Sequence, residues 1–173
     1  MKNIISTIAQ NRWYISERVL GYSEEELDKI EKLYDIRISG HLRDFMLEAG
    51  RSDGGLIGDD PLIIFRNLWS IRNQVLTQTS IRDSILGLSL YSSPPSDEIF
   101  YNKPFVFSIE YETQYFYLNT GAENSSRVFH YDENNELIED TQMDFIEYMK
   151  YLVRTYGKFE PRIICRGELL VII

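Results

Sequence analysis

The sequence is short of cysteine and histidine and has no long apolar run. Cys165 is the only cysteine, which excludes an internal disulfide. No apolar stretch approaches the roughly 20 residues that span a bilayer, and the N-terminus lacks the apolar core and small-residue cleavage site of a secretory signal. These absences predict a cytoplasmic protein that does not enter a membrane.

The same shortages bear on catalysis and metal binding. His41 and His130 are the only histidines, too few with one cysteine for a zinc site. The Gly54-Gly55 pair lacks the Lys-Ser/Thr of a phosphate-binding loop, and no Gly-x-Ser-x-Gly nucleophile motif occurs. We therefore expect no catalytic residues, no metal and no cofactor.

Length and composition indicate one globular domain. The chain has 173 residues, of which 43% are hydrophobic and 26% charged, enough to bury a real core. We assign residues 1–173 to a single domain. Residues 1–20 are expected to form an N-terminal arm or helix, and residues 157–173 a C-terminal hairpin or strand.

Residues 105–138 carry the pattern of an antiparallel meander. Phe105, Phe107 and Ile109 alternate with more polar positions that end at Glu110, the period of a strand with one buried face. Residues 114–119, 127–131 and 136–138 are read as the following strands, joined by short polar connections. The prediction is a sheet with one apolar face and one acidic face.

Helix signals lie on both sides of this meander. Ser23 and Glu26 have the spacing of a capping box. Three further helices are expected: one from Ser39 to Gly50, one after Asn67 with Ile71, Val75 and Leu76 inward, and one from Thr141 to Gly157. The predicted fold class is α+β, with a mostly antiparallel sheet of four to six strands flanked by helices.

The net charge of −9 is concentrated in one part of the chain. Residues 97–149 contain twelve acidic side chains and two basic ones, whereas the remainder has fifteen acids and sixteen bases. Such a segment repels nucleic acid and attracts a basic protein. The simpler alternative is that the acidic balance only keeps the protein soluble.

Several stretches together resemble the SUKH superfamily, which includes fungal Smi/Knr-type cell-wall regulators and bacterial immunity proteins. The stretches are residues 23–31, 42–47, Gly54-Gly55 and the Tyr-Phe-Tyr-Leu run at 115–118. The chain resembles a divergent member, because Ile38-Ser39 stands where that family usually has Leu-Pro. The resemblance implies an α+β fold without catalysis and, for bacterial members, neutralisation of a toxin by direct binding.

The expected function is binding of a basic protein surface, such as that of a toxin with nuclease activity. Residues expected at the interface are the carboxylates Glu110, Glu112, Glu123, Asp132, Glu133 and Glu136, the aromatic anchors Tyr111, Tyr115 and Tyr117, and, as extra contributors, Asp59 and Asp60. Two alternatives stay open. One is a hydrolase with Glu110 and Glu112 as a carboxylate pair, and the other is a regulatory scaffold of the cell-wall type.

Overall fold

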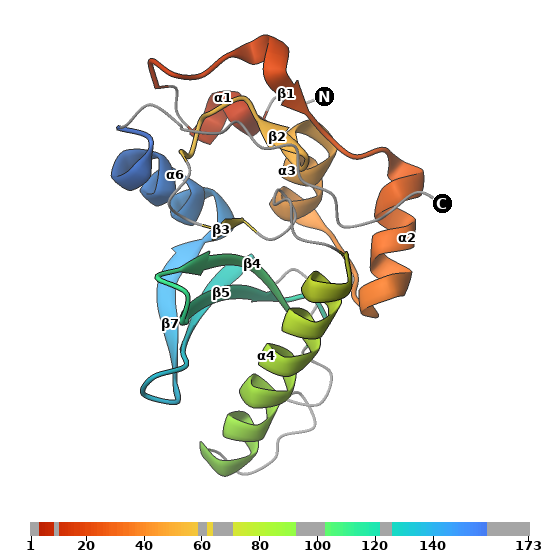
Figure 1. Ribbon diagram of the computed structural model, residues 1–173, viewed down its shortest axis with the longest axis vertical. Helices are drawn as coiled ribbons and strands as arrows, with labels where there is room; N and C mark the ends of the chain where they lie inside the picture. Colours follow the sequence, from red (N-terminus) through yellow and green to blue (C-terminus); the bar gives the residue numbers. More distant parts are fainter. Residues whose placement is uncertain are drawn as a thin grey trace.

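The computed structural model describes residues 4–8, 11–58, 62–63, 71–92, 103–121 and 126–158 (Figure 1). Within the expected N-terminal arm, α1 (Ile4–Ile8) is a short helix and η1 (Ser16–Arg18) a single 3-10 turn. The C-terminal hairpin expected at residues 157–173 lies outside the described residues after Lys158.

The first two long helices begin where their sequence signals predict, and the second ends at the predicted glycine. α2 (Glu24–Tyr34) starts with a reciprocal capping box, in which Glu26 N donates to Ser23 Oγ and Ser23 N donates to the Glu26 carboxylate. α3 (Gly40–Ala49) follows Ser39, which occupies the N-cap position without a side-chain cap bond, and ends at Gly50. The short strands β1 (Val19–Leu20) and β2 (Ser52–Asp53) pair beside these helices.

The predicted meander is confirmed as the main sheet. Its strand order is β3-β4-β5-β6-β7, and every neighbouring pair is antiparallel. The strands are β3 (Leu62–Ile63), β4 (Pro104–Glu110), β5 (Gln114–Asn119), β6 (Arg127–Asp132) and β7 (Leu137–Asp144). β7 is longer than expected because it continues to the cap of the next helix. The fold class is α+β, as predicted.

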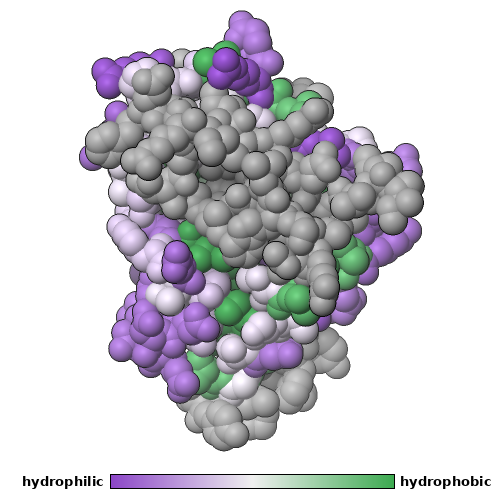
Figure 2. Space-filling view, viewed as in Figure 1, coloured by the Kyte–Doolittle hydropathy of each residue, from purple (hydrophilic) through white to green (hydrophobic). Residues whose placement is uncertain are grey.

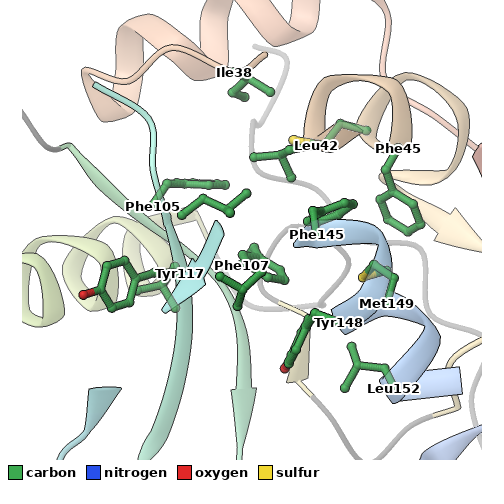
Figure 3. Packing of buried hydrophobic residues seen from close by; sticks show 14 of the residues in the cluster. Ile38, Leu42, Phe45, Phe105, Phe107, Tyr117, Phe145, Tyr148, Met149 and Leu152 are labelled. Carbon is green, nitrogen blue, oxygen red and sulfur yellow. The ribbon is translucent and has the colours of Figure 1, made fainter. Parts of the chain in front are cut away.

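Helices cover both faces of this sheet. α4 (Ile71–Ser92) crosses one face and touches β4 and β7, whereas α6 (Phe145–Tyr156) packs on the other through Phe107 and Tyr148. Figure 3 shows Tyr117 on the opposite side of the strands from Phe107, Phe145 and Tyr148. All seven residues of β4 are consequently buried, so the expectation of a half-buried strand was wrong.

A bulge in β4 explains why the predicted alternation fails. The register with β5 shifts between Val106 and Ser108, and both Phe107 and Ser108 contact Tyr148 of α6. One extra residue reverses the parity of the strand after it. Glu110 therefore lies on the same face as Phe107 instead of on the opposite face, where the sequence alternation had placed it.

A buried glutamine hydrogen-bonds the backbone of β4. Within the described part of β3, Leu62 and Ile63 pair with Ile109 and Ser108. Further along β4, Val106 N donates to Gln78 Oε1 at 3.1 Å, and Gln78 Nε2 donates to Val106 O at 2.5 Å. The Gln78 amide of α4 thus satisfies both backbone polar groups of buried Val106.

Two predicted helix details were wrong. Asp144, not Thr141, caps α6, through a capping box with Glu147. Leu76, predicted to face inward on α4, is 57% exposed. Asn67, the predicted cap of that helix, lies outside the described residues.

Candidate functional site

The two tight turns of the meander lie side by side at one end of the sheet. Glu110, Gln114 and Asp132 are register partners across three strands, so turn 111–113 and turn 133–136 leave the sheet together. We call residues 111–113 and 132–137 the hairpin end. Figure 2 shows hydrophilic residues gathered at the lower left, where the β6–β7 turn lies in Figure 1.

Hydrogen bonds join the two turns. Glu133 N donates to Thr113 O at 3.0 Å, and Asn134 Nδ2 donates to Thr113 Oγ1 at 2.7 Å. Gln114 Nε2 donates to Asp132 Oδ1 at 3.0 Å. The hairpin end is therefore one connected surface.

Asp132 is held ionised by the turn that it begins. Its carboxylate accepts hydrogen bonds from Asn134 N at 2.9 Å and Asn135 Nδ2 at 2.6 Å. The Asn135 side chain, followed by Gln114, lowers the pKa of Asp132 below its ordinary value. Its negative charge is thus a fixed part of the hairpin end at neutral pH.

Three residues without glycine's conformational freedom take left-handed backbone angles here. The φ values are 51° at Tyr111, 65° at Glu112 and 51° at Glu136. Such angles cost free energy for any L-residue with a Cβ atom. Tyr111 is nevertheless 79% exposed, and Glu112 and Glu136 are also exposed, so this strained backbone presents an aromatic ring and two carboxylates to solvent.

Tyr115 and Tyr117 do not lie on the surface where they were expected as anchors. Both are buried on the α4 face, where Tyr115 stacks on Tyr131 at 5.9 Å and Tyr117 on Phe129 at 5.6 Å between ring centroids. The covering helix α4 explains the error. The Tyr115 hydroxyl donates to Glu133 at 3.0 Å, and burial followed by Glu133 raises the pKa of Tyr115 to about 12.

Glu110 is likewise not part of an acidic surface. It is 4% exposed, and its carboxylate accepts from the Tyr148 hydroxyl at 2.9 Å and from the Tyr156 hydroxyl. Tyr148 also contacts Ser108 Oγ at 3.0 Å. The reason is the β4 bulge, which directs Glu110 toward α6. Glu112 lies beyond the strand end and is exposed, so the two glutamates do not share a strand face as the carboxylate-pair alternative assumed.

Other acidic side chains of residues 97–149 lie close to basic side chains or cap a helix. Asp140 lies 3.7 Å from Arg127 and Glu139 3.6 Å from His130. Asp144 and Glu147 cap α6, whose exposed side also carries Lys150 and Arg154. Of the acidic side chains that the structure describes in this segment, Glu112, Asp132, Glu133 and Glu136 of the hairpin end have no basic residue in the turns that carry them. Asp97 and Glu98 are not among the described residues. Glu123, Asp59 and Asp60 lie outside the described residues.

Two features of the site were missed from the sequence. Leu137 is 49% exposed beside Glu136, although it begins a strand. The left-handed residues at Tyr111 and Glu112 were missed because no glycine or asparagine marks them. A tight hairpin without glycine or asparagine was the only sequence signal that these positions would be strained.

Among the described residues, no three or more histidine, cysteine or acidic side chains are grouped to hold a metal ion. None of the described helices combines the length and apolar character needed to cross a membrane. Comparison with family models, curated proteins and solved structures finds no match for this chain.

Proposed function

We propose that this chain is a protein-binding domain whose hairpin end binds a basic surface of a partner protein. The observation that carries the proposal is the joined pair of turns, which carries four carboxylates together with exposed Tyr111 and Leu137. Exposed aromatic and aliphatic anchors within a charged rim are the usual composition of a protein interface. Because the turns are hydrogen-bonded to each other, little ordering is needed on binding.

Strained backbone supports the same assignment. A tight hairpin is most stable with Asn-Gly at left-handed positions, yet Tyr111 and Glu112 stand there. Strain of this kind clusters at functional sites, where a particular side chain must be presented. The Tyr111 side chain also hydrogen-bonds Tyr156. A binding role accounts for the glutamate at position 112 and for a tyrosine ring that stays 79% exposed.

The finer proposal is that the partner is a toxin and the chain its immunity protein. The helix pair α2–α3 before a meander closed by α6 fits the resemblance to the SUKH superfamily, and a nuclease toxin offers a positive substrate-binding surface to block. An acidic inhibitor surface also accelerates encounter with such a target. The protein would act in the cytoplasm by covering that surface.

The test begins with the product of the reading frame next to this gene. Co-expression and co-purification identify the complex, and stopped-flow kinetics then measure association. Changing Glu112, Glu133 and Glu136 to lysine is expected to slow association about tenfold or more at low salt, with a smaller difference at high salt. A complex whose association rate is unchanged by the three substitutions contradicts the proposed surface.

A matched control separates local charge from total charge. Glu17, Asp44 and Asp83 are exposed residues on η1, α3 and α4. Changing these three to lysine alters the net charge by the same amount but leaves the hairpin end intact. This control is expected to keep most of the association rate, and an equal loss in both variants would assign the effect to overall charge.

A further inference from the structure

The strand β7 forms an edge of the main sheet. It stands last in the strand order, at the left of the sheet in Figure 1, and among the described residues it pairs only with β6. An exposed strand edge offers unpaired backbone N–H and C=O groups to another chain, and natural proteins usually block such edges. The hydrogen bonds along β7 show that only one half of this edge is blocked.

The C-terminal half of β7 is blocked by a bulge and by its own side chains. The register with β6 is irregular there, and Gln142 takes a left-handed φ of 59°. Gln142 N donates to Asp140 Oδ1 at 2.8 Å, and Met143 N donates to Thr141 Oγ1 at 3.2 Å. Because these backbone donors are already used and the strand is bent, residues 141–143 do not present a regular edge to another strand.

The half of β7 next to the hairpin end is open. Glu133 N donates to Thr113 O, so the backbone groups of odd-numbered residues in β6 point toward β5, and those of even-numbered residues point toward β7. The register pairs the even-numbered residues of β6 with odd-numbered residues of β7. The backbone N–H and C=O groups of Ile138 and Asp140 therefore point away from the sheet, where no described strand pairs with them.

The side chains of this open half define what can lie beside it. Ile138 is half-buried and packs against the core. Glu139 points to the other face and is exposed, with only His130 Nδ1 as a nearby basic group, at 3.6 Å. Asp140 is exposed but lies 3.7 Å from Arg127. A strand added here would therefore meet an apolar side chain on one face and an acidic side chain on the other.

We propose that the open half of β7 binds an extended segment of the partner protein, in which apolar and basic residues alternate, as an added strand. An apolar side chain of the segment lies beside Ile138, and a lysine or arginine lies beside Glu139. This inference rests on the proposed binding of a basic partner and adds how part of that partner is held. The open half continues directly from the hairpin end, which ends at Leu137. A second copy of the chain fits less well, because pairing two β7 edges brings acidic residues of both copies together.

The first experiment titrates the isotope-labelled full chain with the probe peptide acetyl-Lys-Val-Lys-Val-Lys-Val-amide at constant ionic strength. We expect saturable NMR shifts of the Ile138 and Asp140 amides at a Kd on the order of 1 mM, together with slower hydrogen exchange of both amides. The acidic peptide acetyl-Glu-Val-Glu-Val-Glu-Val-amide should not bind. Shifts confined to the turns of the hairpin end, or equal binding of the two peptides, would overturn the proposal.

Methylation of the peptide backbone tests strand pairing directly. One lysine peptide is N-methylated at its valines and another at its lysines, so both keep the same charge and side chains. Because only every second residue of an added strand directs its N–H toward β7, one pattern should weaken binding about tenfold or more, and the other should leave affinity within about twofold. Equal affinities of the two methylated peptides would contradict backbone pairing and indicate attraction by charge only.

Charge reversal tests the side chain that selects the segment. Glu139→Lys should weaken binding of the lysine peptide about fivefold and allow the glutamate peptide to bind. Because Glu139 is exposed, the substitution leaves the core unchanged. Glu17→Lys, on η1, changes the net charge equally and should bind the lysine peptide as the parent chain does. The same response in both variants would remove Glu139 from the site.

Self-association is measured on the chain without peptide. Sedimentation velocity and the NMR signals of the Ile138 and Asp140 amides are followed against protein concentration, and both should stay constant. Concentration-dependent shifts of these amides would assign the edge to a second copy and overturn the proposal. None of these measurements uses the partner protein, so they fail or succeed separately from the stopped-flow test of the hairpin end.

Discussion

The two faces of the main sheet are both buried, but by different chemistry. The α4 face consists largely of stacked aromatic rings, Tyr115 on Tyr131 and Tyr117 on Phe129. The α6 face combines phenylalanine rings with a polar cluster, in which Glu110 accepts from the hydroxyls of Tyr148 and Tyr156. Burial in this protein therefore does not follow polarity: a glutamate is enclosed as completely as its aromatic neighbours because tyrosine hydroxyls satisfy it.

The largest expected effect comes from breaking the polar cluster. Glu110→Ala leaves the Tyr148 and Tyr156 hydroxyls without their shared acceptor and opens a cavity, so we expect unfolding free energy to fall by about 3 kcal/mol. Tyr117→Phe on the α4 face is the control and should change the free energy of unfolding by less than about 0.5 kcal/mol, since the ring remains packed. Urea denaturation measures both. Similar values for the two variants would show that the polar cluster adds nothing to stability.

A second comparison uses alkaline pH. Burial raises the pKa of Tyr115 to about 12, and burial followed by Glu110 raises the pKa of Tyr148 well above its ordinary value. Because the folded state holds these protons more tightly than the unfolded chain, whose tyrosines ionise near pH 10, stability is complete below pH 10 and falls as pH rises toward 12.

Urea midpoints between pH 8 and 12 test this expectation, together with tyrosine absorbance at 295 nm. The double variant Tyr148→Phe/Tyr156→Phe should reduce the alkaline loss more than Tyr115→Phe/Tyr117→Phe, because both α6-face hydroxyls lie against the buried Glu110 carboxylate. On the α4 face, Tyr115 lies against Glu133, which is exposed. A stability that is constant to pH 12 in the parent chain would contradict the burial of these hydroxyls.

The smallest expected effect concerns the turn where both faces end. Replacing Tyr111-Glu112 by Asn-Gly relieves two left-handed positions but removes the side-chain hydrogen bond between Tyr111 and Tyr156, so the protein should gain less than about 1 kcal/mol of stability. The same change removes the exposed ring and one carboxylate, so the partner should bind more weakly. A more stable variant that binds equally well would remove Tyr111 and Glu112 from the interface.

Local signals in the sequence predicted most of the elements. The capping box at Ser23, the end of α3 at Gly50 and the order of the meander strands all depend on neighbouring residues, and all were predicted correctly. The failures required information from distant parts of the chain. No local pattern shows that α4 covers Tyr117 or that a bulge directs Glu110 toward α6.

Local sequence signals also predicted part of the candidate site, and the part they missed depends on residues far apart in the chain. Glu112, Glu133 and Glu136 are on exposed turns, where turn composition placed them, and Tyr111 follows the strand end. Their assembly into one surface depends on the Thr113 contacts with Glu133 and Asn134, which form only once β5 and β6 pair. Charge counting along the chain also treated buried Glu110 and the helix-capping Asp144 as surface charge.

Asp144 is at once the last residue of β7 and the N-cap of α6, so strand and helix meet without a linker. A force applied to the β6–β7 turn would pass along β7 directly into α6, because no flexible linker separates them. Since α6 carries Tyr148 and Tyr156, which donate to Glu110 at the last position of β4, the force would return to the hairpin end of the sheet. A pulling force on this end should therefore unfold β7 and α6 and break the hydrogen bonds of Glu110 in one step. This coupling lets the hairpin end resist deformation when a partner binds.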